Sequence, residues 1–104
     1  LAGHAIPPYG EFASTFEGLR SRIAYVLELL NSLEPSQFER EESRVVESKA
    51  GNAQVSLRAP EFLLLYALPN FFFHITVGYA ILRSLGVAVG KENFDGLHSY
   101  EPEP

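Results

Sequence analysis

The feature that most constrains this chain is a run of twenty-one residues, 62–82, that contains no formally charged side chain. Three consecutive phenylalanines stand within it, Phe71, Phe72 and Phe73, and a helix would point them in directions about 100° apart. More than one face of such a helix must be kept from water, and a single neighbouring helix cannot cover them all. The run therefore predicts a central helix that is enclosed on several sides.

The same run is long enough to cross a membrane, which takes roughly twenty apolar residues. Pro69, Asn70 and His74 lie near its middle, where polar groups are expensive in hydrocarbon, and no basic cluster flanks either end. We therefore favour the helix of a soluble bundle and expect no membrane partner. A membrane-inserted segment over residues 62–82 is kept as an alternative.

Composition narrows the function classes. The chain has 104 residues, 46% hydrophobic and 20% charged, which is ordinary for one globular domain. Its net charge is −5 and its eight Lys and Arg residues are spread singly, so no basic stripe is available for nucleic acid. There is no cysteine for disulfides or thiolate metal sites, and no methionine, so we expect a processed form or a fragment. The compartment stays open, with the cytoplasm favoured.

The first predicted helix covers residues 15–33, with Ser14 as its N-cap and Glu17 completing a capping box. It should stop before Pro35, because the residue preceding a proline disfavours the helical conformation. Its apolar residues recur at helical spacing and form one stripe. They are Phe16, Leu19, Ile23, Val26, Leu27, Leu30 and Leu33.

The second half of the chain contains two kinds of predicted element. Residues 44–58 contain two short runs joined by Gly-Asn, which predicts a small β-hairpin. A long helix over residues 60–85 follows, and Pro69 should kink it near Ala67 or restart it. Gly86 is placed to end that helix. We expect one helical domain over residues 1–95 and a flexible acidic tail over 96–104.

A family resemblance rests on these segments. The run LPNFFFH at residues 68–74, followed by AILRSLGVAVGK at 80–91, resembles the C-terminal signature of a functionally uncharacterised protein family. The run TFEGLRSRIAYVLELLNSL at 15–33, with the charged loop and hairpin after it, resembles the same family. We place that family in the DinB-like superfamily of four-helix bundles. The resemblance covers nearly the whole chain.

The resemblance implies a mainly α fold in which a helical hairpin and a small β-hairpin form half of a DinB-like four-helix bundle. Members of the family begin with a further pair of helices that this sequence does not contain. We therefore expect a homodimer, or a second chain that supplies the missing helices.

Metal-binding members of the superfamily use three histidines, two of them one turn apart on the last helix. Here Asn70 and Gly78 occupy the positions one turn before and after His74, so the second histidine is missing. We expect no cofactor, and a divalent metal with His74 as a ligand is the alternative.

The candidate site centres on His74, which projects to the inward side of the predicted helix together with Asn70. It is either a core histidine whose ring nitrogens are hydrogen-bonded, or a residue that faces a pocket between helices. The ligand-pocket candidates are His74, Asn70, Gly78 and Tyr79, and no catalytic residue is assigned.

Three functions remain open at this point. The leading one is a non-enzymatic helical module that self-associates or holds a small apolar ligand between its helices. The alternatives are a metal-assisted small-molecule transferase of the DinB-like type and the membrane-inserted segment, so the sequence leaves open whether the chain is an enzyme.

Overall fold

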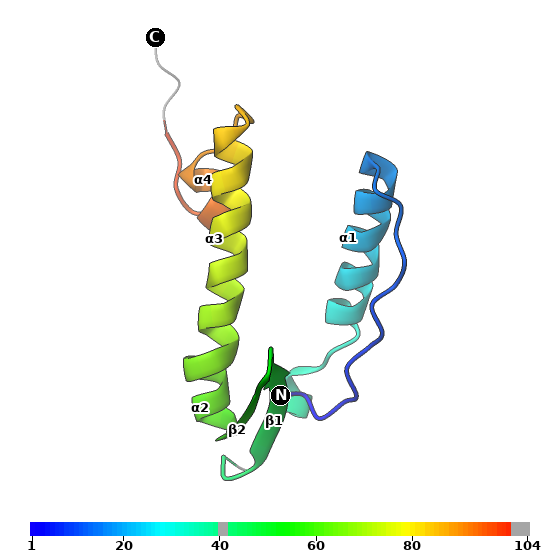
Figure 1. The fold of residues 1–104 in the computed structure, drawn as a ribbon, viewed down its shortest axis with the longest axis vertical. Helices are drawn as coiled ribbons and strands as arrows, with labels where there is room; N and C mark the ends of the chain where they lie inside the picture. Colours follow the sequence, from blue (N-terminus) through cyan, green and yellow to red (C-terminus); the bar gives the residue numbers. More distant parts are fainter. Residues whose placement is uncertain (40–41, 101–104) are drawn as a thin grey trace. The chain divides into compact units, whose positions relative to one another are not determined.

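The computed structural model describes residues 1–39 and 42–100, and its elements are labelled in Figure 1. The chain falls into two compact units, residues 1–60 and 61–104, which are described separately. The expectation of one domain over residues 1–95 stays a prediction. Part of the predicted acidic tail, residues 101–104, lies outside the described residues.

Helix α1 of the first unit spans Phe16–Asn31. Its N-cap is Thr15, whose hydroxyl oxygen accepts a hydrogen bond from the Gly18 N–H at 3.0 Å. The helix thus begins one residue later than predicted, and Thr15 rather than Ser14 supplies the cap. Either hydroxyl side chain suits this position chemically, and the extended backbone of Thr15 determines which one is used.

The N-terminal arm, residues 1–14, runs beside α1 (Figure 1). The Tyr25 hydroxyl donates a hydrogen bond to the Pro8 carbonyl at 3.1 Å, and the Tyr25 ring lies 5.8 Å from that of Phe12. The guanidinium of Arg22 lies 5.1 Å from the centre of the Phe12 ring, in cation–π range. These contacts hold the arm against one side of the helix.

A short 3₁₀ turn, η1 (Pro35–Phe38), follows α1 and precedes a β-hairpin. Strands β1 (Val45–Ala50) and β2 (Ala53–Arg58) pair antiparallel, with Val46 opposite Leu57. Gly51 has a positive φ of 61° and Asn52 does not, which is the pattern of a two-residue type II′ turn. The predicted hairpin and its Gly-Asn turn are confirmed.

A continuous helical stretch begins at the last two residues of the first unit and makes up most of the second unit. It comprises α2 (Ala59–Glu61), the π-helical segment η2 (Phe62–Ala67) and α3 (Leu68–Ser84). The π segment lies immediately before Pro69, whose ring would clash with the carbonyl four residues earlier in a regular α-helix. Wider turns therefore absorb the proline, where the sequence predicted a kink or a restart.

This local geometry leaves one carbonyl open. The Leu68 N–H bonds to the Leu63 oxygen, five residues back, and Pro69 has no N–H to donate. The Leu64 oxygen consequently receives neither the i+4 nor the i+5 donor that a helix would provide.

Gly86, with a φ of 78°, terminates α3 as predicted, and the Val87 N–H caps the Leu82 carbonyl. The chain then forms a short helix, α4 (Lys91–Asp95), where only a turn-rich segment was expected. The Phe94 ring of α4 meets the Tyr79 ring of α3 edge to face at 5.5 Å. Arg83 donates to the Val89 carbonyl at 2.8 Å, so the exit segment covers one side of α3.

The expectation of half a four-helix bundle is wrong. Each unit contains one long helix, and among residues 1–39 and 42–100 neither unit shows a buried core between facing helices. Within residues 1–39 and 42–100, the single buried large apolar side chain is Phe62, at 9% exposure. Helical periodicity predicted which side of each helix is apolar. It does not predict which other segment packs against that side.

Candidate functional site

Three of the predicted site residues share one side of α3. Asn70, His74 and Gly78 follow one another at intervals of four residues, which places them in a row along the helix, and all three are exposed. Three apolar side chains at 41–56% exposure flank this row. We call the six residues the α3 open face: Asn70, Phe71, His74, Val77, Gly78 and Ile81.

Tyr79, the fourth predicted residue, lies on another side of α3. It is half-buried against Phe94 and does not join the row. The structure thus brings together three of the four predicted residues. The segment that forms α4 shows no hydrophobic periodicity in the sequence, so its contact with Tyr79 was not predicted.

His74 was expected to face inward, but it is exposed in this unit. Its ring lies edge to face with Phe73, 5.3 Å between centres. Within the described part of the chain, neither His74 nor Asn70 makes a side-chain hydrogen bond. The role of His74 as a pocket residue or metal ligand stays a prediction.

No group of three or more His, Cys, Asp or Glu side chains that could hold a metal ion occurs among residues 1–39 and 42–100. On the α3 open face, His74 is the one residue of these types. It would supply a single nitrogen ligand, and the other ligands would have to come from outside the face.

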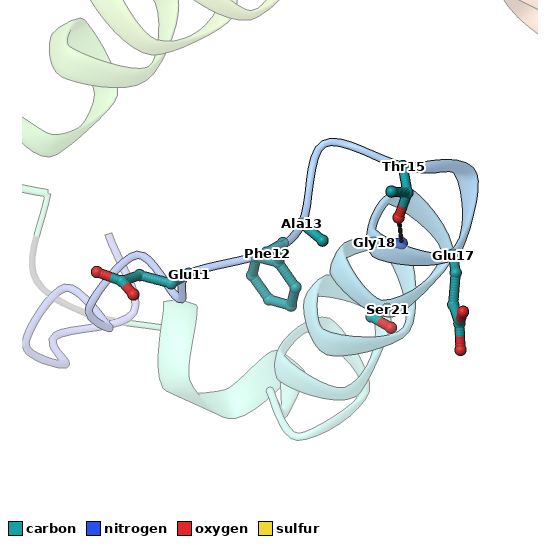
Figure 2. Close-up of a pocket in the computed structure, with 7 residues that line it drawn as sticks. All are labelled: Glu11, Phe12, Ala13, Thr15, Glu17, Gly18 and Ser21. Atoms are coloured by element: carbon teal, nitrogen blue, oxygen red, sulfur yellow. Dashed lines mark hydrogen bonds between the residues drawn. The ribbon is translucent and has the colours of Figure 1, made fainter.

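A hollow that the sequence did not indicate lies at the N-terminal end of α1 (Figure 2). Its volume is about 330 Å³, and the N-terminal arm forms one wall. The carboxylates of Glu11 and Glu17 point away from each other in Figure 2, and the Thr15 oxygen accepts from Gly18. The lining therefore provides no acid–base pair and no activated nucleophile. Its residues are Glu11, Phe12, Ala13, Thr15, Glu17, Gly18 and Ser21.

The largest pKa shift among the described residues is at Asp95, the last residue of α4. Asp95 accepts the backbone N–H groups of His98 and Leu97 at 2.9 and 2.8 Å, and its other oxygen meets Nδ1 of His98. The backbone hydrogen bond from His98, followed by that from Leu97, lowers the pKa of Asp95 from 3.8 to about 2. These interactions order the chain directly after α4.

Comparison with known families identifies a family for this chain. The profile of the family described as "Domain of unknown function (DUF1993)" matches residues 1–95. The chain belongs to the DUF1993 family. A search of curated proteins found no match.

Membership in DUF1993 confirms the expectation of a functionally uncharacterised family, and residues 1–95 include both α1 and the α3 open face. The family match does not extend to the DinB-like superfamily or to a particular activity. The function of this DUF1993 chain must therefore be argued from its surfaces.

One helical stretch in the described part of this DUF1993 chain is long and apolar enough to cross a membrane. This stretch is Ala59–Ser84, which has 26 residues. Only 6% of its most apolar 18-residue window is buried. A helix that is covered by another protein surface meets the same criteria of length and composition.

Proposed function

We propose that this DUF1993 chain is a non-enzymatic helical module that self-associates through the α3 open face. The single observation that carries the proposal is the exposure of this uncharged face in a 26-residue apolar helix. Burying an aromatic or Leu-sized side chain is worth about 1.5–3 kcal/mol, so covering Phe71, Val77 and Ile81 provides a substantial driving force. Contiguous exposed apolar surface of this kind is typical of interfaces.

The composition of the face indicates the nature of its partner. Residues 62–82 contain no formally charged side chain, so a charged group on a partner would have no counterion there. A second copy of the same helix offers a surface of equal character. Gly78 has nothing within 4 Å of the position where a Cβ would lie, which leaves room for the backbone of a partner helix.

The polar groups along α3 also favour a protein partner. Asn70 and His74 each retain their hydrogen-bonding capacity, and the Leu64 carbonyl is open. Unpaired polar groups cost about 1–3 kcal/mol each when buried without a partner. Another protein surface or water can pair with them, whereas hydrocarbon cannot.

Membrane insertion is the second candidate, and the length of Ala59–Ser84 favours it. At 1.5 Å per residue, 26 residues span about 39 Å, more than the roughly 30 Å hydrocarbon core. The open Leu64 carbonyl, Asn70 and His74 would then lie within the bilayer, where each is costly.

One pair of variants tests the proposal. Ile81→Glu places a charge in the α3 open face, and Thr76→Glu places the same charge on the side of α3 away from that face. In sedimentation at micromolar concentration, Ile81→Glu should lower the weight-average mass and Thr76→Glu should leave it unchanged. Equal masses for wild type and both variants would contradict the proposal.

A flotation assay separates the two candidates. Association through protein predicts that the chain stays in the aqueous fraction when it is mixed with phosphatidylcholine vesicles. Co-flotation of the wild type that Ile81→Glu abolishes would support membrane insertion instead.

A further inference from the structure

We infer that the Asp95–Gly96 sequence is a site of spontaneous isomerisation to isoaspartate, and that the folded end of α4 controls the rate. The site lies where α4 ends, since Asp95 is the last helical residue and Gly96 is the C-cap. It uses no residue of the α3 open face. The inference therefore goes beyond the proposed function and can fail or succeed separately.

Isomerisation at an Asp–Gly sequence is an intramolecular condensation followed by a hydrolysis. The Gly96 nitrogen attacks the side-chain carboxyl carbon of Asp95, the nitrogen loses its proton, and the carboxyl hydroxyl leaves as water. The five-membered succinimide ring that results then takes up one water molecule. Ring opening at the original backbone carbonyl leaves the main chain running through the former side chain, which is isoaspartate. The two steps consume no oxidant and no other reactant.

The local sequence favours this reaction at one place in the chain. Glycine is the most permissive neighbour, because it has no Cβ atom to obstruct the approach of its nitrogen to the carboxyl carbon. Asp95 and Gly96 are both exposed to the water that the hydrolysis requires. Asp95 is also the one aspartate of the 104-residue sequence. Isomerisation of aspartate is therefore confined to a single position.

The folded structure holds the Asp95 carboxyl group in its unreactive form. One oxygen accepts the backbone N–H groups of His98 and Leu97 at 2.9 and 2.8 Å, and the other oxygen meets Nδ1 of His98. These hydrogen bonds, the one from the His98 backbone first, lower the pKa of Asp95 from 3.8 to about 2 and so favour the ionised form. Only the protonated carboxyl group can release its hydroxyl as water, so the hydrogen bonds slow the first step.

The attacking nitrogen is held as well. The Gly96 N–H donates to the Glu92 carbonyl at 2.9 Å, so the proton that must leave is engaged in a hydrogen bond. Backbone N–H groups protected in this way become available through local opening, as in hydrogen exchange. When opening and closing are fast, the rate of a slow reaction follows the population of the open form. Opening of the end of α4 would release both reacting groups together.

The stability of α4 depends on a contact that a substitution can remove. The helix has five residues, Lys91–Asp95, and a helix of that length is not stable alone. The Phe94 ring packs edge to face against the Tyr79 ring of α3, with 5.5 Å between centres. Phe94→Ala should therefore raise the population of the open form and accelerate isomerisation, although the Phe94 side chain takes no part in the reaction.

The test is a prolonged incubation of the full chain at neutral pH, followed by peptide mapping with electron-transfer fragmentation. This method distinguishes isoaspartate from aspartate at unchanged mass, whereas deamidation of an asparagine changes the peptide mass. The wild type is incubated both in buffer and in concentrated guanidinium chloride. We expect isoaspartate at position 95 to accumulate at least several-fold faster in the denatured chain.

Two variants test the control by α4. Phe94→Ala should react several-fold faster than the wild type in buffer and at the same rate in guanidinium chloride, where both chains are unfolded. Phe72→Ala is the matched control, because the Phe72 ring contacts Phe71 and not α4, and it should keep the wild-type rate.

The outcomes are distinct. Absence of isoaspartate from the denatured wild type would show that the site is unreactive and would overturn the inference. Equal rates in buffer and in guanidinium chloride would show that the fold does not control the reaction. An unchanged rate in Phe94→Ala, or an equal acceleration in Phe72→Ala, would overturn the assignment of that control to α4.

Discussion

The backbone of Ala13 approaches Gly18 so closely that a Cβ atom at position 18 would lie 1.9 Å from the Ala13 carbonyl oxygen. Atoms at that distance cannot coexist, and the obstructing atom belongs to the backbone. The glycine is therefore required for the N-terminal arm to reach α1. Gly18 is the third residue of α1, and within a helix glycine costs about 0.5–1 kcal/mol relative to alanine on propensity alone.

The first prediction follows from this approach. Gly18→Ala should lower the free energy of unfolding by roughly 1–3 kcal/mol, because the clash outweighs the gain in helix propensity. Gly78→Ala is the matched control, since nothing lies within 4 Å of its Cβ position. It should raise stability in the monomer by about 0.5–1 kcal/mol. Urea denaturation of both variants measures the two effects, and equal changes would contradict the close approach.

The second prediction concerns the Tyr25 hydroxyl. Tyr25→Phe removes the hydrogen bond to the Pro8 carbonyl but keeps the ring beside Phe12. We expect a loss of about 0.5–1.5 kcal/mol in arm docking, detected as faster amide exchange in residues 1–14. Tyr25→Ala, which also removes the ring contact, should accelerate exchange further. Unchanged exchange in Tyr25→Ala would show that the arm is held elsewhere.

The third prediction concerns Pro69. Pro69→Ala restores a backbone N–H, so the π segment η2 should revert to α-helical bonding and helix stability should rise, by at most about 3 kcal/mol. An isotope-labelled Leu64 carbonyl should move to lower infrared frequency as it gains a donor. Pro60→Ala is the control, because Pro60 lies in the first helical turn, where the N–H has no intrahelical partner. A Leu64 band that is already at the bonded frequency in the wild type would refute the open carbonyl.

The fourth prediction is a pH dependence after α4. The pKa of Asp95 is lowered to about 2 in the folded chain, so its ionised form is favoured there. The resulting stabilisation is present above the ordinary value of 3.8 and is lost as the pH falls toward about 2. NMR signals of His98 and Tyr100 should therefore shift toward those of an unstructured chain between these two pH values.

Asp95→Asn provides the control for this titration. It keeps one acceptor oxygen but removes the ionisable carboxyl, so the transition in the His98 signals over the same pH range should disappear. A transition that persists in Asp95→Asn would have to be assigned to another group.

Helix ends and turns that depend on residues nearby in the chain could be predicted from the sequence. Pro35 and Gly86 mark where α1 and α3 must already have ended, and Gly51 supplies the positive φ of the hairpin turn. Each of these effects acts over a few residues, so local sequence contains the required information. The family assignment was likewise within reach, because the run at residues 68–74 is distinctive.

The site was predicted in part for the same reason. The common side of Asn70, His74 and Gly78 follows from intervals of four residues in a helix, and the structure retains it. Tyr79 does not join these three residues, because it packs against Phe94. Phe94 reaches Tyr79 only because the chain reverses after Gly86. A contact between residues fifteen positions apart produces no periodic pattern in the local sequence, so it could not be predicted in this way.

The sequence by itself determined the order helix, hairpin, helix and the apolar face of each helix. Only the tertiary structure decided which sides are covered within each unit: the arm lies against the Gly18 side of α1, and α4 lies against the Tyr79 side of α3. The physical reason is that helical spacing determines which side chains share a face, whereas cover depends on where a distant segment can approach without a clash. At Gly18 that approach is possible because no Cβ atom is present.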